Sequence, residues 1–327
     1  MQEKKVTIVI PNYNGIKYIR GCMDSLRREK EAGDSFDIVV VDNASKDGSL
    51  EVLRQEYPGA QIIALDSNTG FCHAVNVGIK AAKTPYVILL NNDTVVKPGY
   101  VNALTEAIEK NEKIFSVSPM MLSMQEENII DDAGDGYCLF GWTYARGKGK
   151  PAEKYEKAVD IFAACGGASI YRKSVFEEIG YFDELHFAYL EDIDVGYRAR
   201  IYGYRNVYEP SAKVLHAGSA TSGSRYNEFK TKLSSANNAY IIGKNMPLLQ
   251  LLFNLPFLVI GFLIKAFFFS LKKMGILYVR SYFSGIARCF SKEGRKHKVS
   301  FQMKHFLNYF KIQISLILGI FRILIKY

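Results

Sequence analysis

The tripeptide Asn91-Asn92-Asp93 follows an apolar run, Tyr86 to Leu90, and carries the first candidate chemistry of the chain. A carboxylate at the end of a buried strand is held rigidly at the mouth of a sheet. Hard divalent cations prefer such oxygen ligands and bridge them to substrate phosphates. Asn and Asp also favour turns, so the tripeptide taken alone is at least as consistent with a plain turn.

Three acids in four residues, Glu191, Asp192 and Asp194, stand at the start of a helix predicted over 190–202. At an exposed site they would simply favour the positive end of the helix dipole, by about 0.3–1 kcal/mol each. The apolar residues around them predict a partly buried helix instead. A paired carboxylate near a cleft is a candidate general base.

Three further side chains follow predicted strands. The ring of Tyr13 could stack on a nucleotide base, and the carboxylate of Asp42 could accept from a ring N–H. Each is equally consistent with turn chemistry, but together they outline a nucleotide site. His216 could complete a metal shell or contact phosphate, although an isolated histidine is more often structural. No P-loop and no Gly-x-Gly-x-x-Gly follows the first strand, which argues against P-loop and NAD enzymes.

The elements that must position these side chains alternate between strand and helix over the first hundred residues. Strands are predicted over 6–10, 37–41, 61–65 and 85–90, and helices over 16–28, 49–57 and 70–82. This alternation predicts an α/β fold with a mostly parallel twisted sheet and helices on both faces. Ligands of such sheets gather at the carboxyl ends of the strands, so the polar residues there should converge on one crevice.

Two apolar segments close the chain, at 248–271 and 306–325, and a polar link joins them. Each could span a membrane, since ~20 apolar residues suffice. Their polar residues, however, recur on one helical stripe, which predicts amphipathic helices lying in the membrane interface beside anionic lipid. The stripes are Gln250, Asn254, Gly261, Lys265 and Lys272, then Lys304, Asn308, Lys311, Ser315, Arg322 and Lys326. A helical pair packed on a soluble domain and a spanning hairpin are the alternatives.

The composition is that of a globular protein, with 48% hydrophobic and 23% charged residues among 327. The net charge of +9 suits nucleic acid, anionic lipid or phosphorylated molecules. Nucleic acid is not expected as a partner, because the basic residues concentrate beside the apolar helices. No signal peptide is visible before the first strand. A homo-oligomer is one option that the sequence leaves open.

Five ordered runs, at 6–15, 41–49, 68–71, 90–94 and 189–194, resemble family 2 glycosyltransferases. Further runs at 164–173, 180–184 and 216–222 are similar to the bacterial rhamnosyltransferase-like branch of that family. The resemblance covers residues 5–226. It implies a GT-A fold and an inverting transfer from a nucleotide-sugar donor, with dTDP-rhamnose as the expected donor and a UDP-sugar as the alternative.

The resemblance also implies roles for single residues. Asp192 matches the catalytic base, and Glu191 would support it. Asp93 matches the final Asp of the metal-binding Asp-x-Asp motif, and His216 matches a metal-associated histidine, so magnesium or manganese is the implied cofactor. Asn91 replaces the first Asp of the motif, which puts its direct ligation in doubt. The positions implied around the nucleotide-sugar are Pro11, Tyr13, Asp42, Asn68, Gly70, Asn91, Asn92 and Gly167.

We therefore expect a catalytic domain over 1–245, with a nucleotide-binding half (1–115) and an acceptor and catalytic half (116–245). Membrane-associating helices would follow over 246–327. The expected role is bacterial cell-surface polysaccharide synthesis on a glycan or polyprenyl-linked acceptor, at the cytoplasmic face of the cell membrane. A nucleotidyltransferase on a similar sheet is an alternative, but it would need a Gly-rich basic loop after the first strand, and this sequence has none there. A non-catalytic membrane-surface scaffold would leave Asp93 and Asp192 without a joint purpose.

Overall fold

The computed structural model describes residues 4–218 and 226–324 of the chain. Its first half consists of strands alternating with helices, as predicted. The elements are β1 (Val6–Asn12), α1 (Ile19–Glu31), β2 (Phe36–Asp42), α2 (Ser49–Glu56), β3 (Gln61–Ala64), α3 (Phe71–Ala81) and β4 (Tyr86–Leu89). Helix α1 starts three residues later than predicted, because the amides of Tyr18 and Ile19 first close a turn on the carbonyl of Gly15.

The central sheet has the strand order β10-β12-β6-β11-β4-β1-β2-β3. In the second half of the chain its strands are β6 (Ile114–Ser123), β10 (Val159–Ile161), β11 (Ile170–Arg172) and β12 (Arg205–His216). Strands β1, β2, β3 and β4 run parallel, and β12 runs parallel to β6. Strand β11 is antiparallel to both of its neighbours, so β4 and β6 point the same way. The predicted mostly parallel sheet is confirmed, with one reversed strand at its centre.

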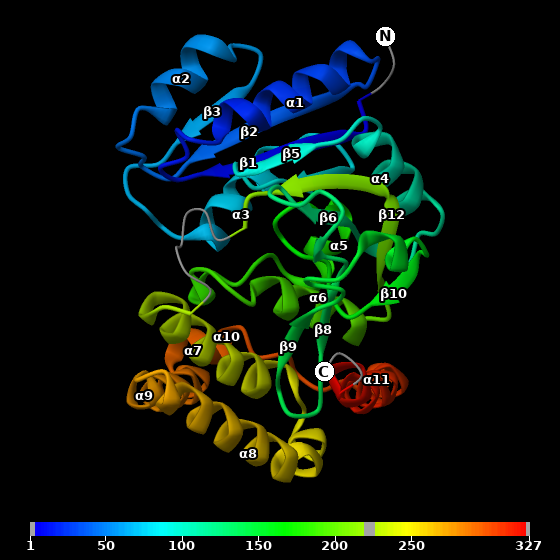
Figure 1. The fold of residues 1–327 in the computed structure, drawn as a ribbon. Coiled ribbons are helices and arrows are strands. Elements are labelled where there is room, and N and C mark those ends of the chain that lie inside the picture. Colours follow the sequence, from blue (N-terminus) through cyan, green and yellow to red (C-terminus); the bar gives the residue numbers. More distant parts are fainter. Residues whose placement is uncertain (1–3, 219–225, 325–327) are drawn as a thin grey trace.

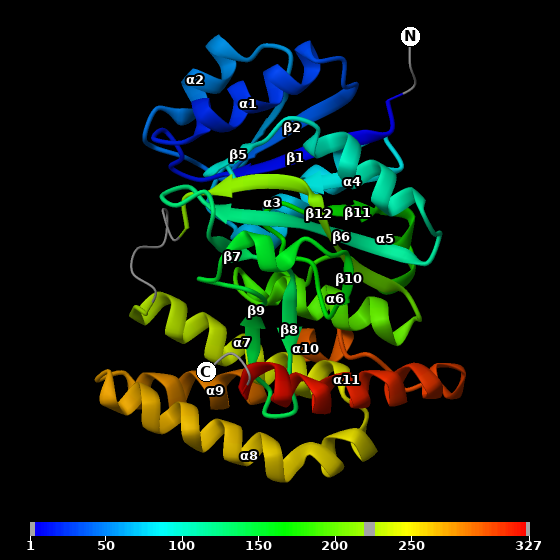
Figure 2. The ribbon, with the colours of Figure 1, turned by 45° about the vertical axis from the view of Figure 1, so that its right-hand side comes forward.

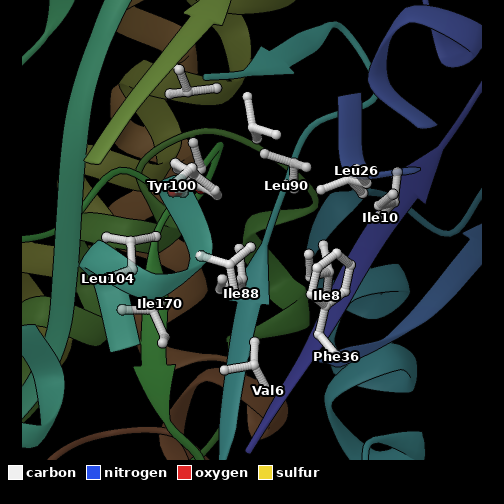
Figure 3. Close-up of a cluster of buried hydrophobic side chains, with 14 of the residues drawn as sticks. Val6, Ile8, Ile10, Leu26, Phe36, Ile88, Leu90, Tyr100, Leu104 and Ile170 are labelled. Atoms are coloured by element: carbon white, nitrogen blue, oxygen red, sulfur yellow. Dashed lines mark hydrogen bonds between the residues drawn. The ribbon is translucent and has the colours of Figure 1, made fainter. Parts of the chain in front are cut away.

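Both faces of this sheet are buried, which explains the helices on each side. Along β1, Ile8 and Ile10 point into one cluster and Val9 into another, because side chains of a strand alternate between faces. Figure 3 shows the first cluster, where Ile8 and Ile88 lie beside Leu104 of α4 (Tyr100–Glu109). Burying each such side chain contributes about 1.5–3 kcal/mol to folding.

The remaining elements of the second half pack below the sheet (Figures 1 and 2). A small hairpin, β8 (Asp135–Tyr137) and β9 (Thr143–Ala145), reaches down to the C-terminal layer, where the amide of Leu139 donates to the carbonyl of Leu316 at 2.9 Å. Two short strands, β5 (Thr94–Val96) and β7 (Ile130–Asp132), belong to the central sheet, where they pair antiparallel with β12 and β6. The other elements are α5 (Lys173–Ile179), η2 (Glu184–His186), α6 (Glu191–Ile201) and α7 (Glu228–Asn245).

The C-terminal layer contains α8 (Leu248–Leu271), α9 (Gly275–Phe290), α10 (Lys292–Lys296) and α11 (Phe306–Leu324). Between the two apolar segments the structure has a further helix, α9, which the sequence analysis did not predict. No proline interrupts 275–290, and its buried positions Tyr278, Ser281 and Gly285 recur three and four residues apart. That spacing is a helical signal which the polar residues of the segment obscured.

Part of the predicted polar stripes faces the protein rather than water, whereas Lys272, Lys304, Lys311 and Arg322 are exposed. Asn254 of α8 is fully buried and exchanges hydrogen bonds with Gln313 of α11 at 2.7 and 3.1 Å. Lys265 lies over the ring of Trp142, and the side chain of Asn308 donates to the carbonyl of Ile201. Lys326 of the second stripe lies outside the described residues.

The apolar residues of these helices consequently face outward. By length and composition alone, α8 and the segment Met303–Ile323 could each cross a membrane. The most exposed apolar side chains of α8, α9 and α11 define what we call the apolar face: Leu248, Leu249, Leu252, Phe253, Leu263, Phe267, Leu271, Ile276, Phe283, Phe290, Phe306, Leu307, Phe310 and Phe321.

Candidate active site

The carboxyl ends of three neighbouring strands are joined by a buried network around Asn12. Its amide nitrogen donates to Asp42 Oδ1 at 2.7 Å, and its amide oxygen accepts from Asn92 Nδ2 at 2.8 Å. The predicted convergence of these strand ends is therefore present in the structure. Asp42 and Asn92 are turned toward Asn12, so their contact with a nucleotide stays a prediction.

The loop before α3 lies beside these strand ends, because Asn43 bonds both the carbonyl of Asn12 and the carbonyl of Gly70. Asn43 Nδ2 donates to Asn68 Oδ1, and the amide of Gly70 donates to the same oxygen, both at 3.0 Å. Gly70 has a φ of 86° and opens helix α3. Tyr13, at the end of β1, is 38% exposed, so its ring is available for stacking, and Pro11 before it is partly exposed.

Asp93 and His216 lie side by side because the strand after Asp93, β5, pairs with the end of β12. In this register Thr94 is the partner of His216. His216 Nε2 lies 3.4 Å from Asp93 Oδ1, and His216 Nδ1 lies 2.7 Å from Asp131 Oδ2. Residues 219–222, the rest of the predicted run at 216–222, lie outside the described residues.

The donor set of Asp93 and His216 fits a divalent cation. Ligand atoms lie about 2.0–2.2 Å from a small cation, so two ligand atoms 3.4 Å apart can share one ion. A metal-ligating histidine normally donates its other ring N–H to a carboxylate, which fixes the tautomer. Asp131 is placed to accept that hydrogen bond, and Lys148 Nζ holds its other oxygen at 2.6 Å.

Asp192, the predicted base, is the second residue of α6. Its Oδ1 accepts from the amide of Ile193 at 2.7 Å, and its Oδ2 accepts from the amide of Gly166 at 3.5 Å. The side chain stays partly accessible, whereas Glu191 is buried. Burial, together with the neighbouring Asp192, raises the pKa of Glu191 to about 8. Burial also raises the pKa of Asp192, but the amides of Ile193 and Gly166 lower it, so Glu191 is the member of the pair that more readily holds a proton.

A backbone turn at Gly166-Gly167 links the two halves of the site. The amide of Asn91 donates to the carbonyl of Gly167 at 2.7 Å. A Cβ at position 167 would lie 3.0 Å from Asn91 Nδ2, and one at position 166 would lie 3.9 Å from Asp192 Cβ. The end of β4 and the base therefore lie on two sides of one glycine turn.

Comparison with known proteins identifies the family of this chain. Residues 7–180, more than half of the chain, match the family model described as Glycosyl transferase family 2. The chain belongs to glycosyl transferase family 2. The resemblance predicted from the sequence is confirmed. The rhamnosyltransferase-like branch is supported by a relative whose name is that of a rhamnosyltransferase.

One relative of this glycosyltransferase is the N-acetylglucosaminyl-diphospho-decaprenol L-rhamnosyltransferase of Mycobacterium tuberculosis, which is 28% identical over 208 residues. The match covers 55% of this chain and 66% of the relative, slightly less than two thirds of its length.

Two solved structures share the fold. The structure of GalNAc-T7 with UDP, GalNAc and Mn²⁺ has a TM-score of 0.59 at 17% identity, and covers 74% of this chain and 48% of its own. The mannosyltransferase PcManGT from Pyrobaculum calidifontis, in complex with GDP-Man and Mn²⁺, has a TM-score of 0.53 at 14% identity, over 98% and 87% of the two chains. The predicted GT-A fold is confirmed.

Sequence reasoning missed three acids of this glycosyltransferase, Asp131, Asp132 and Asp135. Carboxyl oxygens of Asp135 and Asp192 and the sulfur of Cys165 lie within 4.8 Å of one another. Burial raises the pKa of Asp132 to about 7 and raises the pKa values of Asp135 and of the Cys165 thiol well above their usual ranges. Three acids in five residues, 131–135, are a signal that the sequence analysis did not use.

The cluster of Asp135, Cys165 and Asp192 does not suit magnesium or manganese. A buried, protonated thiol is a poor ligand for a hard cation. The pair of Asp93 and His216 offers a carboxylate and an imidazole whose orientation Asp131 holds. Of the two sets, Asp93 and His216 are therefore the one that could hold such a cation, whereas Asp135 shares a hydrogen bond with Asp192.

The third acid of the predicted cluster, Asp194, has a structural role. It is fully buried, and its carboxylate accepts from Lys244 Nζ, Asn245 Nδ2 and Arg198 Nε at 2.8, 2.8 and 3.0 Å. Burial opposes its ionisation, but these cations hold its pKa far below the usual range. Asp194 therefore fixes the base helix α6 to α7.

Proposed function

We propose that this family 2 glycosyltransferase moves one sugar from a nucleotide donor to an acceptor hydroxyl, with inversion at the anomeric carbon. The observation that carries the proposal is the Gly166-Gly167 turn, which contacts Asn91 on one side and Asp192 on the other. A donor whose diphosphate lies at the strand ends would present its anomeric carbon to the base across this turn. Glycine allows the backbone to approach a sugar closely.

In this mechanism the residues of the chain have separate roles. Asp93 and His216 would hold magnesium or manganese, which neutralises the diphosphate leaving group when bound. Asp192 accepts the proton of the acceptor hydroxyl. The acceptor oxygen forms its bond to the anomeric carbon from the opposite face, while the bond from that carbon to the diphosphate oxygen breaks. General-base catalysis of this kind contributes typically ~10²–10⁴-fold.

The preference of Glu191 for its protonated state supports the assignment of the base. Two adjacent ionised carboxylates would repel each other, so a neutral Glu191 allows Asp192 to be charged near neutral pH. The backbone amides of Ile193 and Gly166 stabilise the negative charge of Asp192. Asp192 is thereby kept ready to accept a proton.

For the donor we propose dTDP-rhamnose. The proposal is supported by the runs that resemble rhamnosyltransferases and by the name of the mycobacterial relative. A UDP-sugar is the second candidate. The nucleotide would contact the strand ends and the loop that carry Tyr13, Asp42, Asn68 and Gly70.

We propose that residues 1–245 carry the catalysis and that residues 246–327 attach the enzyme to the cytoplasmic face of the cell membrane. The apolar face supports this proposal, because many large apolar side chains exposed on one layer of helices are typical of membrane or protein contacts. Attachment at a bilayer suits a polyprenyl-linked acceptor, and the product would serve cell-surface polysaccharide synthesis.

The test is a transfer assay with the purified chain, a polyprenyl-diphosphate-linked sugar as acceptor, and dTDP-rhamnose or a UDP-sugar as donor, with and without manganese. We expect metal-dependent transfer from dTDP-rhamnose. Asp192→Asn should lower kcat by roughly 10²–10⁴-fold while calorimetry still detects the donor. The matched control is Asp160→Asn, at an exposed ion pair with Arg205. If Asp93→Ala and Asp192→Asn both support cellular function as well as wild type does, the non-catalytic membrane-surface scaffold is favoured instead.

A further inference from the structure

A loop of strained backbone, residues 187–190, leads directly into the base helix α6. Phe187, Tyr189 and Leu190 have φ angles of 61°, 70° and 66°. None of them is glycine, and side chains of this kind adopt such angles only where the surrounding structure imposes them. Because Leu190 is followed at once by α6, the conformation of this loop determines where Asp192 points.

The side chain that imposes this conformation is Asn237, which is fully buried in α7. Its amide nitrogen lies 2.8–2.9 Å from three carbonyl oxygens, those of His186, Ala188 and Tyr189. Its amide oxygen is buried with it, and a buried polar atom normally has a hydrogen-bond partner. Arg288 of α9 provides that bond, since its Nη1 donates to Asn237 Oδ1 at 2.9 Å and to the carbonyl of Leu185 at 2.6 Å.

Close packing of α9 on α7 keeps the guanidinium of Arg288 in place. A Cβ at Gly285 would collide with the backbone of Ala236, so the two helices approach as closely as glycine allows. The Arg288 guanidinium also lies 5.5 Å from the centre of the Tyr240 ring. The opposite side of α9 contributes Ile276, Phe283 and Phe290 to the apolar face.

We infer that Arg288 is a positioning residue for Asp192, acting through Asn237 on the backbone of residues 187–190. The inference rests on the proposed function, because it requires Asp192 to be the base. Hydrogen bonds from a charged donor are about twice as strong as neutral ones. Loss of the guanidinium would leave Asn237 free to turn and would release the loop. The same helix that meets the membrane therefore holds the base in its catalytic orientation.

The experiment compares Arg288→Gln and Arg288→Lys with Arg280→Gln, a matched control because Arg280 is exposed on the same helix. In the transfer assay, Arg288→Gln should lower kcat by roughly 10–100-fold, since a displacement of about 1 Å has effects of this size. The donor KM should change much less. Arg288→Lys keeps a charged donor and should recover part of kcat, and Arg280→Gln should match wild type.

Hydrogen exchange separates positioning from general destabilisation. In Arg288→Gln the amides of residues 185–190 should exchange faster, while those of β1 should not. Asn237→Asp, which removes the amide donors, should lower kcat similarly, and adding Arg288→Gln to it should lower kcat little further.

Two results would overturn the inference. One is equal kcat in Arg288→Gln and Arg280→Gln when the wild type transfers sugar. The other is faster exchange in every peptide of Arg288→Gln, with kcat following the folded fraction. If the wild-type chain transfers no sugar from any donor, the proposed function itself fails, and this inference fails with it.

Discussion

His216 Nδ1 lies 2.7 Å from Asp131 Oδ2, while the other ring nitrogen faces Asp93. This hydrogen bond orients the imidazole, and comparable partners of metal ligands contribute about 10–100-fold to metal affinity. We expect Asp131→Asn to weaken manganese binding by that factor, as measured by calorimetric titration. Asp160→Asn, which lies beside the opposite end of β12, is the control. Unchanged affinity in Asp131→Asn would place the cation elsewhere.

The buried Glu191 makes the free energy of unfolding depend on pH. Its pKa rises from 4.5 to about 8 on folding, with burial as the main cause. Between these values the folded state holds a proton that the unfolded state has lost, so stability falls as pH rises through this window. The slope is at most about 1.4 kcal/mol per pH unit. Urea unfolding of Glu191→Gln across pH 5 to 8 should show a smaller decline than wild type, and an identical decline would contradict this assignment.

The first hundred residues were predictable because their strands are apolar on both faces and end in polar residues. Val6, Ile8 and Ile88 lie where the apolar runs predicted, and Asp93 follows its strand as expected. The predicted base and metal ligands also rest on short local runs, and their roles stay predictions. Local pattern was therefore sufficient for this half of the fold and for the position of Asp93 at its strand end.

The contacts that complete the site join residues far apart in the chain. Asp131 reaches His216 across 85 positions, and Asn237 reaches His186 across 51. No repeating pattern in the sequence predicts such pairs, because each side chain is by itself an ordinary polar residue in a turn or helix. The sequence showed the polar stripes of the C-terminal helices, but it did not show what surrounds them. Asn254, for example, faces a neighbouring helix and not water.

Gly70 should be the least replaceable of the predicted donor-site glycines. Its φ is +86°, and a Cβ there would lie 2.6 Å from the carbonyl oxygen of Phe187. We expect Gly70→Ala to lower the free energy of unfolding by about 1–3 kcal/mol and to raise the donor KM. Gly59→Ala is the matched control, because a Cβ at that position would have nothing within 4 Å. Equal urea midpoints for the two variants would show that the loop adapts.

The buried ion cluster around Asp194 predicts that Lys244→Met lowers the free energy of unfolding far more than Arg205→Gln does. Lys244 donates to both Asp183 and Asp194 and is 3% exposed. Lys244→Met would leave two buried carboxylates short of a cation, which costs about 3–5 kcal/mol. Arg205→Gln breaks only an exposed pair with Asp160 and should cost less than about 1 kcal/mol. Chemical unfolding of both variants checks the difference, and equal losses would mean that water reaches the cluster.

The apolar face leads us to expect that the enzyme binds a bilayer through exposed aromatic rings. Phe253 of α8 and Phe310 of α11 are 60% and 59% exposed, so neither is needed to pack the protein. Burying one such ring in lipid contributes about 1.5–3 kcal/mol, so Phe253→Ser and Phe310→Ser should each weaken binding to anionic vesicles about tenfold or more. Thermal unfolding and transfer to a water-soluble acceptor should stay at wild-type values. If vesicle binding is unchanged in the double variant but disappears at high salt, the basic residues alone hold the enzyme at the surface, and the apolar face must meet another protein instead.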